Sequence, residues 1–190
     1  MSRSRAFTLI ELLIVVAIIG ILAAIAVPNF LNARVRALVA RTYADMKAVT
    51  HGFELYRLDH GDWVPDYDGI GMGQGNSEVR TYRALTTPVA YLSSIPLDVW
   101  ISKEDFVRLF NKSEKYYEYY GYNSGGQERL DICARYGIGY VIRSLGPDRA
   151  AQWGGDFLNI GLRNRYYAYD QTNGLLSSGD IIATNRGVPE

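Results

Sequence analysis

The chain has little of the side chains on which most enzymatic and metal chemistry depends. Its 190 residues include one cysteine, Cys133, and two histidines, His51 and His60. A single cysteine excludes an intrachain disulfide and a zinc motif of the CxxC type. A nucleophilic cysteine needs a neighbouring base, and no motif links Cys133 to either histidine. We therefore predict a protein that is not an enzyme and that requires no cofactor for catalysis.

An excess of charge of either sign is also missing. Lys and Arg together number 20, as do Asp and Glu, so the formal net charge is 0. Proteins that bind nucleic acids usually carry a basic patch or stripe, and long blocks of like charge are typical of disordered interaction tails. The sequence shows neither feature, and we predict no nucleic-acid partner.

One run near the N-terminus is almost free of charge. Within residues 7–27, Thr8 and Glu11 are the only strongly polar side chains. A helix of this length spans about 30 Å, which is the thickness of the hydrocarbon core of a bilayer. Arg3 and Arg5 precede the run, and basic flanks stay in the cytoplasm. The run therefore predicts a single transmembrane helix with a cytoplasmic N-terminus.

A conventional secretory signal is the competing interpretation of this run, because Ala24-Ile25-Ala26 matches an A-x-A cleavage site. The mature protein would then be a secreted soluble binding domain. Glu11 argues against this interpretation, since a carboxylate within a spanning helix costs about 3 kcal/mol on insertion scales. A cut between Ala6 and Phe7 would create a new amine about one helical turn from Glu11, and that amine could neutralise the acid.

The string Ala6-Phe7-Thr8-Leu9-Ile10-Glu11-Leu12-Leu13, after a short basic leader, resembles the cleavage and methylation motif of type IV pilins and type II secretion pseudopilins. The resemblance implies that a prepilin peptidase and methyltransferase cuts between Ala6 and Phe7 and N-methylates Phe7. It also implies that Glu11 assists methylation and pairs with the terminal amine of a neighbouring subunit's Phe7 during assembly. The family usually has glycine before the cut, where this chain has Ala6.

The resemblance extends to about Pro96 and is strongest to the major pseudopilins of type II secretion. It implies a structural subunit of a pseudopilus, a homo-oligomeric helical filament that spans the periplasm and supports protein export across the outer membrane. The expected partners are the prepilin peptidase, the inner-membrane assembly platform and the minor pseudopilins. The subunit would cross the bacterial inner membrane once, with its C-terminal domain in the periplasm. A type IV pilin or minor pilin, in a surface fibre for adhesion, motility or DNA uptake, is the alternative.

After Pro28, apolar positions spaced alternately by four and three residues predict an amphipathic helix that ends near Leu58. The stripe consists of Val35, Val39, Thr42, Met46, Val49, Phe53 and Tyr56. Pro28 either kinks one continuous helix or ends its first part.

Tyr-rich and Gly-rich segments in the C-terminal half predict three or four antiparallel strands, with a hairpin turn at Asn173-Gly174. The expected fold class is α+β and pilin-like: a long N-terminal helix, with a transmembrane half and an amphipathic half, packed on a small antiparallel sheet.

These elements predict three segments. They are a cleaved leader (residues 1–6), a transmembrane and polymerisation helix (7–28) and a soluble domain (29–190). The soluble domain comprises a helical spine (29–60), a loop region (61–115) and a sheet (116–190).

Residues 66–80 contain alternating glycines without a following G-K-[ST], so we predict a surface loop and not a phosphate site. Residues 82–100 should pack across the domain through Leu85, Val89, Leu92 and Ile95.

Two segments, Ser144-Leu145-Gly146-Pro147-Asp148 and Ser178-Gly179-Asp180-Ile181, resemble the calcium loop of major pseudopilins. The resemblance implies a structural calcium ion held by carboxylate and carbonyl oxygens, the ligands that calcium prefers. Asp148 and Asp180 are the expected ligands, with Ser144 and Asp156 as further contributors. The intervening segment is longer than the family's loop, and a hydrogen-bonded turn without metal is the alternative.

Overall fold

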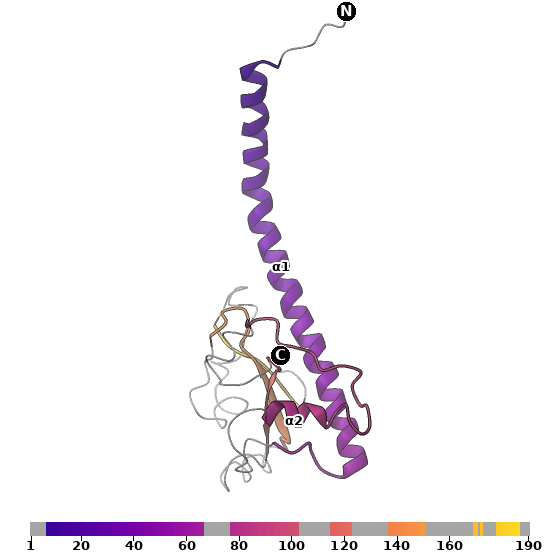
Figure 1. Cartoon of the computed structure of the whole chain (residues 1–190). Coiled ribbons are helices and arrows are strands. Elements are labelled where there is room, and N and C mark those ends of the chain that lie inside the picture. The colour runs from indigo at the N-terminus through magenta and orange to yellow at the C-terminus, as the bar shows by residue number, and fades with distance from the viewer. Residues whose placement is uncertain are drawn as a thin grey trace, which may run out of the picture. The chain divides into compact units, whose positions relative to one another are not determined.

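The computed structural model describes residues 7–66, 77–102, 115–122, 137–150, 169–170, 172 and 178–186. The chain divides into two compact units, Met1–Ala37 and Leu38–Glu190. The elements are, in order, α1 (Leu9–His60), α2 (Ser77–Arg83), β1 (Glu118–Gly121), β2 (Tyr140–Ser144) and β3 (Ile181–Thr184). Figure 1 labels the two helices. This arrangement confirms the predicted α+β fold class.

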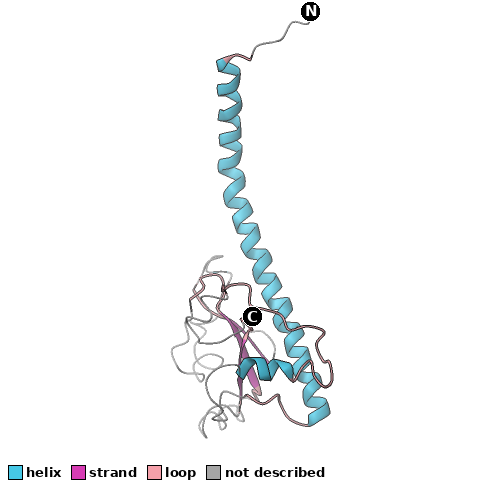
Figure 2. Ribbon diagram, viewed as in Figure 1, coloured by secondary structure: helices cyan, strands magenta, loops and turns pink. Residues whose placement is uncertain are grey.

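Helix α1 contains Pro28 and continues through it to His60 (Figure 2). The alternative in which Pro28 ends the first part of the helix is therefore wrong. From Phe7 to Leu31 the large hydrophobic side chains are all exposed, from 45% at Val15 to 82% at Leu9. By length and composition, α1 can cross a membrane.

The second unit is built on the C-terminal half of α1. Five positions of the predicted stripe are fully buried, which confirms the amphipathic pattern: Val39, Thr42, Met46, Val49 and Phe53. The Phe53 ring packs against Tyr119 and Tyr140 of the sheet, with ring centroids 4.8 and 4.9 Å apart. Figure 1 shows the strands beside this half of the helix. Burial of aromatic area supplies much of the packing between helix and sheet.

The sheet has three antiparallel strands in the order β1-β2-β3. Ile142 in the central strand lies opposite Tyr119 on one side and Ala183 on the other. All residues of β2 and β3 are buried. Because successive side chains point to opposite faces of a strand, both faces of the sheet are covered, including the face that does not pack on Phe53. The hairpin turn predicted at Asn173-Gly174 lies outside the described residues.

The loop predicted for residues 66–80 is wrong at its C-terminal end, where Ser77–Arg83 form α2. A helix this short depends on tertiary packing for its stability. Tyr82 supplies that packing: it is fully buried, lies 5.9 Å from Phe53 between ring centroids, and donates its hydroxyl to the Tyr117 carbonyl at 2.9 Å. Residues 67–76 lie outside the described part of the chain.

The segment after α2 is anchored differently from our expectation. Leu85 is fully buried, as predicted, whereas Val89 is 50% exposed and is not an anchor. Trp100 takes that role: its ring is buried, and its indole N–H donates to the Thr42 hydroxyl of α1 at 2.8 Å. A buried indole needs such a partner for its N–H group, so this hydrogen bond fixes where the segment crosses α1.

Candidate functional site

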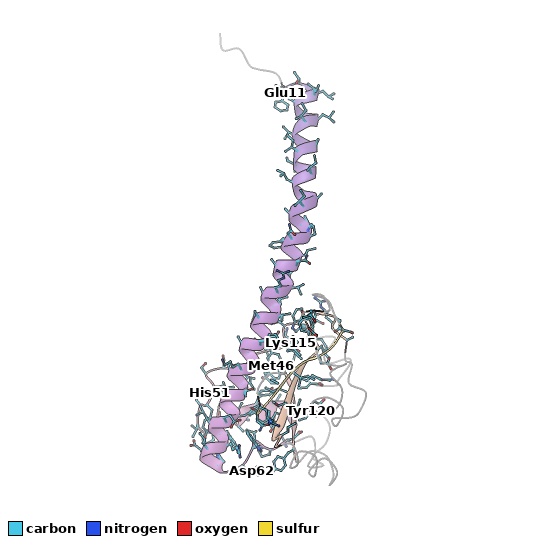
Figure 3. The ribbon with its side chains drawn as sticks, turned by 180° about the vertical axis from the view of Figure 1, so that it is seen from behind. Glu11, Met46, His51, Asp62, Lys115 and Tyr120 are labelled. Carbon is cyan, nitrogen blue, oxygen red and sulfur yellow. The ribbon has the colours of Figure 1, made fainter. Side chains whose placement is uncertain are left out.

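Thr8 and Glu11 form a reciprocal capping box at the start of α1. Figure 3 labels Glu11 at this end of the helix. The Thr8 backbone N–H and hydroxyl both donate to Oε2 of Glu11, at 2.8 and 2.6 Å. In return, the Glu11 backbone N–H donates to the Thr8 hydroxyl at 3.3 Å. This pattern satisfies N–H groups that the first turn of a helix otherwise leaves unpaired. Our interpretation of the sequence missed this role, although T-x-x-E before an apolar run is its signature.

The predicted processing and assembly residues lie at this end of α1. Phe7 directly precedes Thr8 and is exposed, and Glu11 is the acid in the first turn. Ala6 lies outside the described residues. The sequence has no Lys or Arg from Phe7 to Ala33, so the nearest basic side chain further along α1, Arg34, is about 35 Å away along the helix axis.

The structure brings together the two segments of the predicted calcium loop. A Cβ atom on Gly146 would lie 2.8 Å from the carbonyl oxygen of Gly179, so the two loops meet backbone to backbone. Gly146 has a φ of 71°, a conformation that glycine adopts without strain. Both the close approach and the backbone angle therefore require glycine at this position.

The described side chains of the predicted ligand set have partners within the protein. Asp180 is buried and accepts a hydrogen bond from Arg143 Nη1 at 3.3 Å. Asp148 accepts from the backbone N–H of Ala150 at 3.2 Å, as in an ordinary turn. Ser144 is buried at the end of β2, and Asp156 lies outside the described residues.

Within the described ranges, no three Asp, Glu, His or Cys side chains are grouped so that they could hold a metal ion. Backbone carbonyl oxygens also ligate calcium, and that part of the predicted ligand set is separate from this grouping of side chains. Calcium binding itself stays a prediction.

Asp98 lies beside the same loop and is also buried. Burial raises the pKa of its carboxyl group above the ordinary value, while hydrogen bonds from the Trp100 N–H, the Ser144 hydroxyl and the Leu145 N–H partly offset that effect. The Trp100 N–H donates at 2.9 Å. Asp98 thus ties the segment that follows α2 to the end of β2, and its neutral form is favoured relative to an exposed aspartate.

The two histidines lie on α1. His51 is exposed (Figure 3). His60 is exposed too, and its ring stacks on Tyr56 with centroids 3.9 Å apart. Cys133 lies outside the described residues, so the structure does not show it near either imidazole.

Comparison with known proteins decides the family. Residues 1–27 match the family described as the prokaryotic N-terminal methylation motif. Type II secretion system core protein G of Vibrio cholerae is 31% identical over 103 residues, which cover 53% of this chain and 68% of the relative. The chain belongs to the family of type IV pilins and pseudopilins.

Other pilin-like relatives include pilus proteins. Type IV major pilin protein PilE of Neisseria gonorrhoeae is 30% identical over 118 residues, covering 55% of this pilin-like chain and 71% of PilE. Type IV major pilin protein PilA of Myxococcus xanthus is 57% identical over 110 residues, covering 50% of each protein. No solved structure matches the chain.

Proposed function

We propose that this protein is a non-enzymatic structural subunit of a type II secretion pseudopilus, which polymerises through its N-terminal helix to support protein export across the outer membrane. One observation carries the proposal: the N-terminal half of α1 is apolar and exposed, it contains a single acid in its first turn, and it lies within a methylation motif. Similarity to core protein G of Klebsiella pneumoniae, Escherichia coli and Vibrio cholerae supports the secretion assignment.

The exposed apolar surface of the first unit needs a cover. Every large hydrophobic side chain from Phe7 to Leu31 is exposed, and each square ångström of such surface costs about 25 cal/mol in water. Lipid covers this surface while the subunit is in the inner membrane. Neighbouring helices cover it in the filament, so one surface serves both environments.

The charge of Glu11 also needs a partner from outside its own helix. Once residues 1–6 are removed, no basic side chain of α1 lies closer than Arg34, and a carboxylate in an apolar setting is costly unless it is paired. The methylated amine of a neighbouring subunit's Phe7 supplies that charge. Cleavage by a prepilin peptidase is therefore a condition for assembly with the inner-membrane platform and the minor pseudopilins.

Arg3 and Arg5 in the leader favour an orientation with the N-terminus in the cytoplasm. The second unit then lies in the periplasm, where the filament grows. This orientation predicts that protease added to spheroplasts degrades residues 38–190 and spares the N-terminal end.

A type IV pilin is the second candidate, because PilA of Myxococcus xanthus is 57% identical over the matched half of the chain. Deletion of the coding sequence in the source bacterium separates the two functions. Loss of exported proteins from the medium, with surface filaments and motility unchanged, supports a pseudopilus. Loss of surface filaments with unchanged export contradicts it and supports a pilin. The wild-type sequence should restore the lost trait, and a Glu11→Leu variant should not.

A further inference from the structure

Arg143 lies at the centre of the sheet between two carboxylates. In the central strand β2 it is directly opposite Glu118 of β1 and Ile182 of β3. Asp180 precedes Ile182 by two residues, so its side chain points to the same face of the sheet as Arg143. The guanidinium pairs with Glu118, which accepts from Nε at 2.7 Å, and with Asp180, which accepts from Nη1 at 3.3 Å. One cation therefore connects β1, β2 and the residue that precedes β3.

All members of this triad are removed from water. The exposed fractions are 3% for Arg143, 4% for Glu118 and 2% for Asp180. Burial lowers the pKa of Arg143, but Glu118, Tyr120 and Asp180 more than offset that effect and raise it overall. Arg143 is therefore charged, as buried carboxylates require of their partner.

The position of the triad matters because Asp180 also belongs to the paired loops 144–148 and 178–180. A calcium ion bound by Asp180 would lie within a few ångströms of the guanidinium, and two cations that close together repel strongly in a buried setting. Asp180 already has a cation, which comes from the chain itself. Arg143 thus supplies a positive charge at the described part of the loop pair, where a metal ion would otherwise provide one.

We propose that Arg143 is a built-in counter-ion that joins β1, β2 and the segment before β3, and that it takes the structural role of a bound calcium ion at the paired loops. The fold of this subunit, and with it the supply of assembly-competent protein, is then independent of calcium. The proposal concerns the second unit alone and does not rest on the choice between pseudopilus and pilus.

The first test uses the full chain purified in detergent, which is heated in the presence of calcium or of a chelator. Near-ultraviolet circular dichroism of its tyrosines and tryptophans measures the unfolding. The proposal predicts the same melting temperature in both conditions. A melting temperature several degrees lower in the chelator would overturn it.

A second test compares substitutions of two arginines. Arg143→Leu leaves two buried carboxylates without their cation and should lower the melting temperature by many degrees. Arg41→Leu is the matched control, because Arg41 pairs with Asp45 at 3.6 Å but is 62% exposed, and it should change the melting temperature little. Equal effects of the two substitutions would contradict the proposal.

Asp180→Asn keeps the test decisive where Arg143→Leu does not fold. This substitution keeps the shape of the side chain and removes its charge. If Asp180 pairs with Arg143, the melting temperature falls by the same amount with calcium and with chelator. If Asp180 is a calcium ligand, the variant instead loses a calcium-dependent stabilisation that the wild type possesses, and the proposal is wrong.

Discussion

Thr8 and Glu11 satisfy one another's hydrogen-bonding groups, with both Thr8 donors on Oε2 of Glu11 at 2.8 and 2.6 Å. The acid on which our assembly proposal depends is therefore also the acid that caps its own helix. A substitution that removes Glu11 entirely changes both properties, so the two must be separated by the choice of variant.

Glu11→Gln and Glu11→Leu separate charge from capping. Glutamine can still complete a capping box, whereas leucine cannot, and both substitutions remove the charge. Because both make the spanning helix less costly to insert, membrane insertion should persist in each variant. Filament assembly should fail in each, because the amine of a neighbouring Phe7 loses its charge partner. Electron microscopy and the yield of sheared or cross-linked filaments measure assembly.

The glutamine variant is the informative one. Wild-type filament yield from Glu11→Gln would show that capping is sufficient and that the charge pair is not needed. Thr8→Val serves as the control for capping, because it keeps the acid and removes the Thr8 hydroxyl that donates to it.

Gly139→Ala should destabilise the second unit. A Cβ atom at this position would overlap the Trp63 indole ring, so the ring must shift. In its present position the ring contacts Tyr140 edge-on, at 5.0 Å between centroids, and Arg57 lies 4.2 Å above it. Overpacking of this kind costs about 1–3 kcal/mol, and thermal melting measures it. The cost should shrink in a Trp63→Leu background, since leucine leaves room for the methyl group. An undiminished cost there would show that the strain arises elsewhere.

Asp98 should make stability fall as the pH rises. Because burial raises the pKa of this carboxyl group in the folded state, the folded protein binds its proton more tightly than the unfolded chain does. The contribution is therefore fully favourable below the ordinary pKa, near pH 4, and is lost as the pH rises through the folded-state value. Asp98→Asn cannot titrate, and its amide oxygen can still accept from the Trp100 N–H.

Urea unfolding of the wild type and Asp98→Asn between pH 4 and 7 isolates this contribution, since the other acids are common to both proteins. The wild type should lose stability relative to the variant as the pH rises. A difference that is constant with pH, or that changes in the opposite direction, would contradict the assignment.

Local patterns in the sequence predicted the first unit and the stripe of α1 correctly. The spacing of Val39, Thr42, Met46, Val49 and Phe53 is a property of one helix, and so is the apolar run that contains Glu11. The capping box was equally local and could have been predicted from Thr8 and Glu11. What the sequence could not supply is the set of contacts between distant segments.

Helix α2 and the role of Arg143 depend on such contacts. Residues 77–83 are helical because Tyr82 is buried against Phe53 and Tyr117, which lie far away in the sequence. An arginine within the strand Tyr140–Ser144 suggests an exposed face, because a charge is rarely buried without a partner. Only the pairing of Arg143 with Glu118 and Asp180 shows that this arginine is buried together with carboxylate partners.

The N-terminus of the mature protein tests the central claim most directly. Intact-mass and fragment-ion mass spectrometry of the membrane form should show a chain that has lost residues 1–6 and that begins with an N-methylated Phe7. The motif at residues 1–27 and the position of Glu11 both predict this product. A mature chain that begins at Val27, after a conventional signal cleavage, would lack the whole polymerisation helix and would contradict the account.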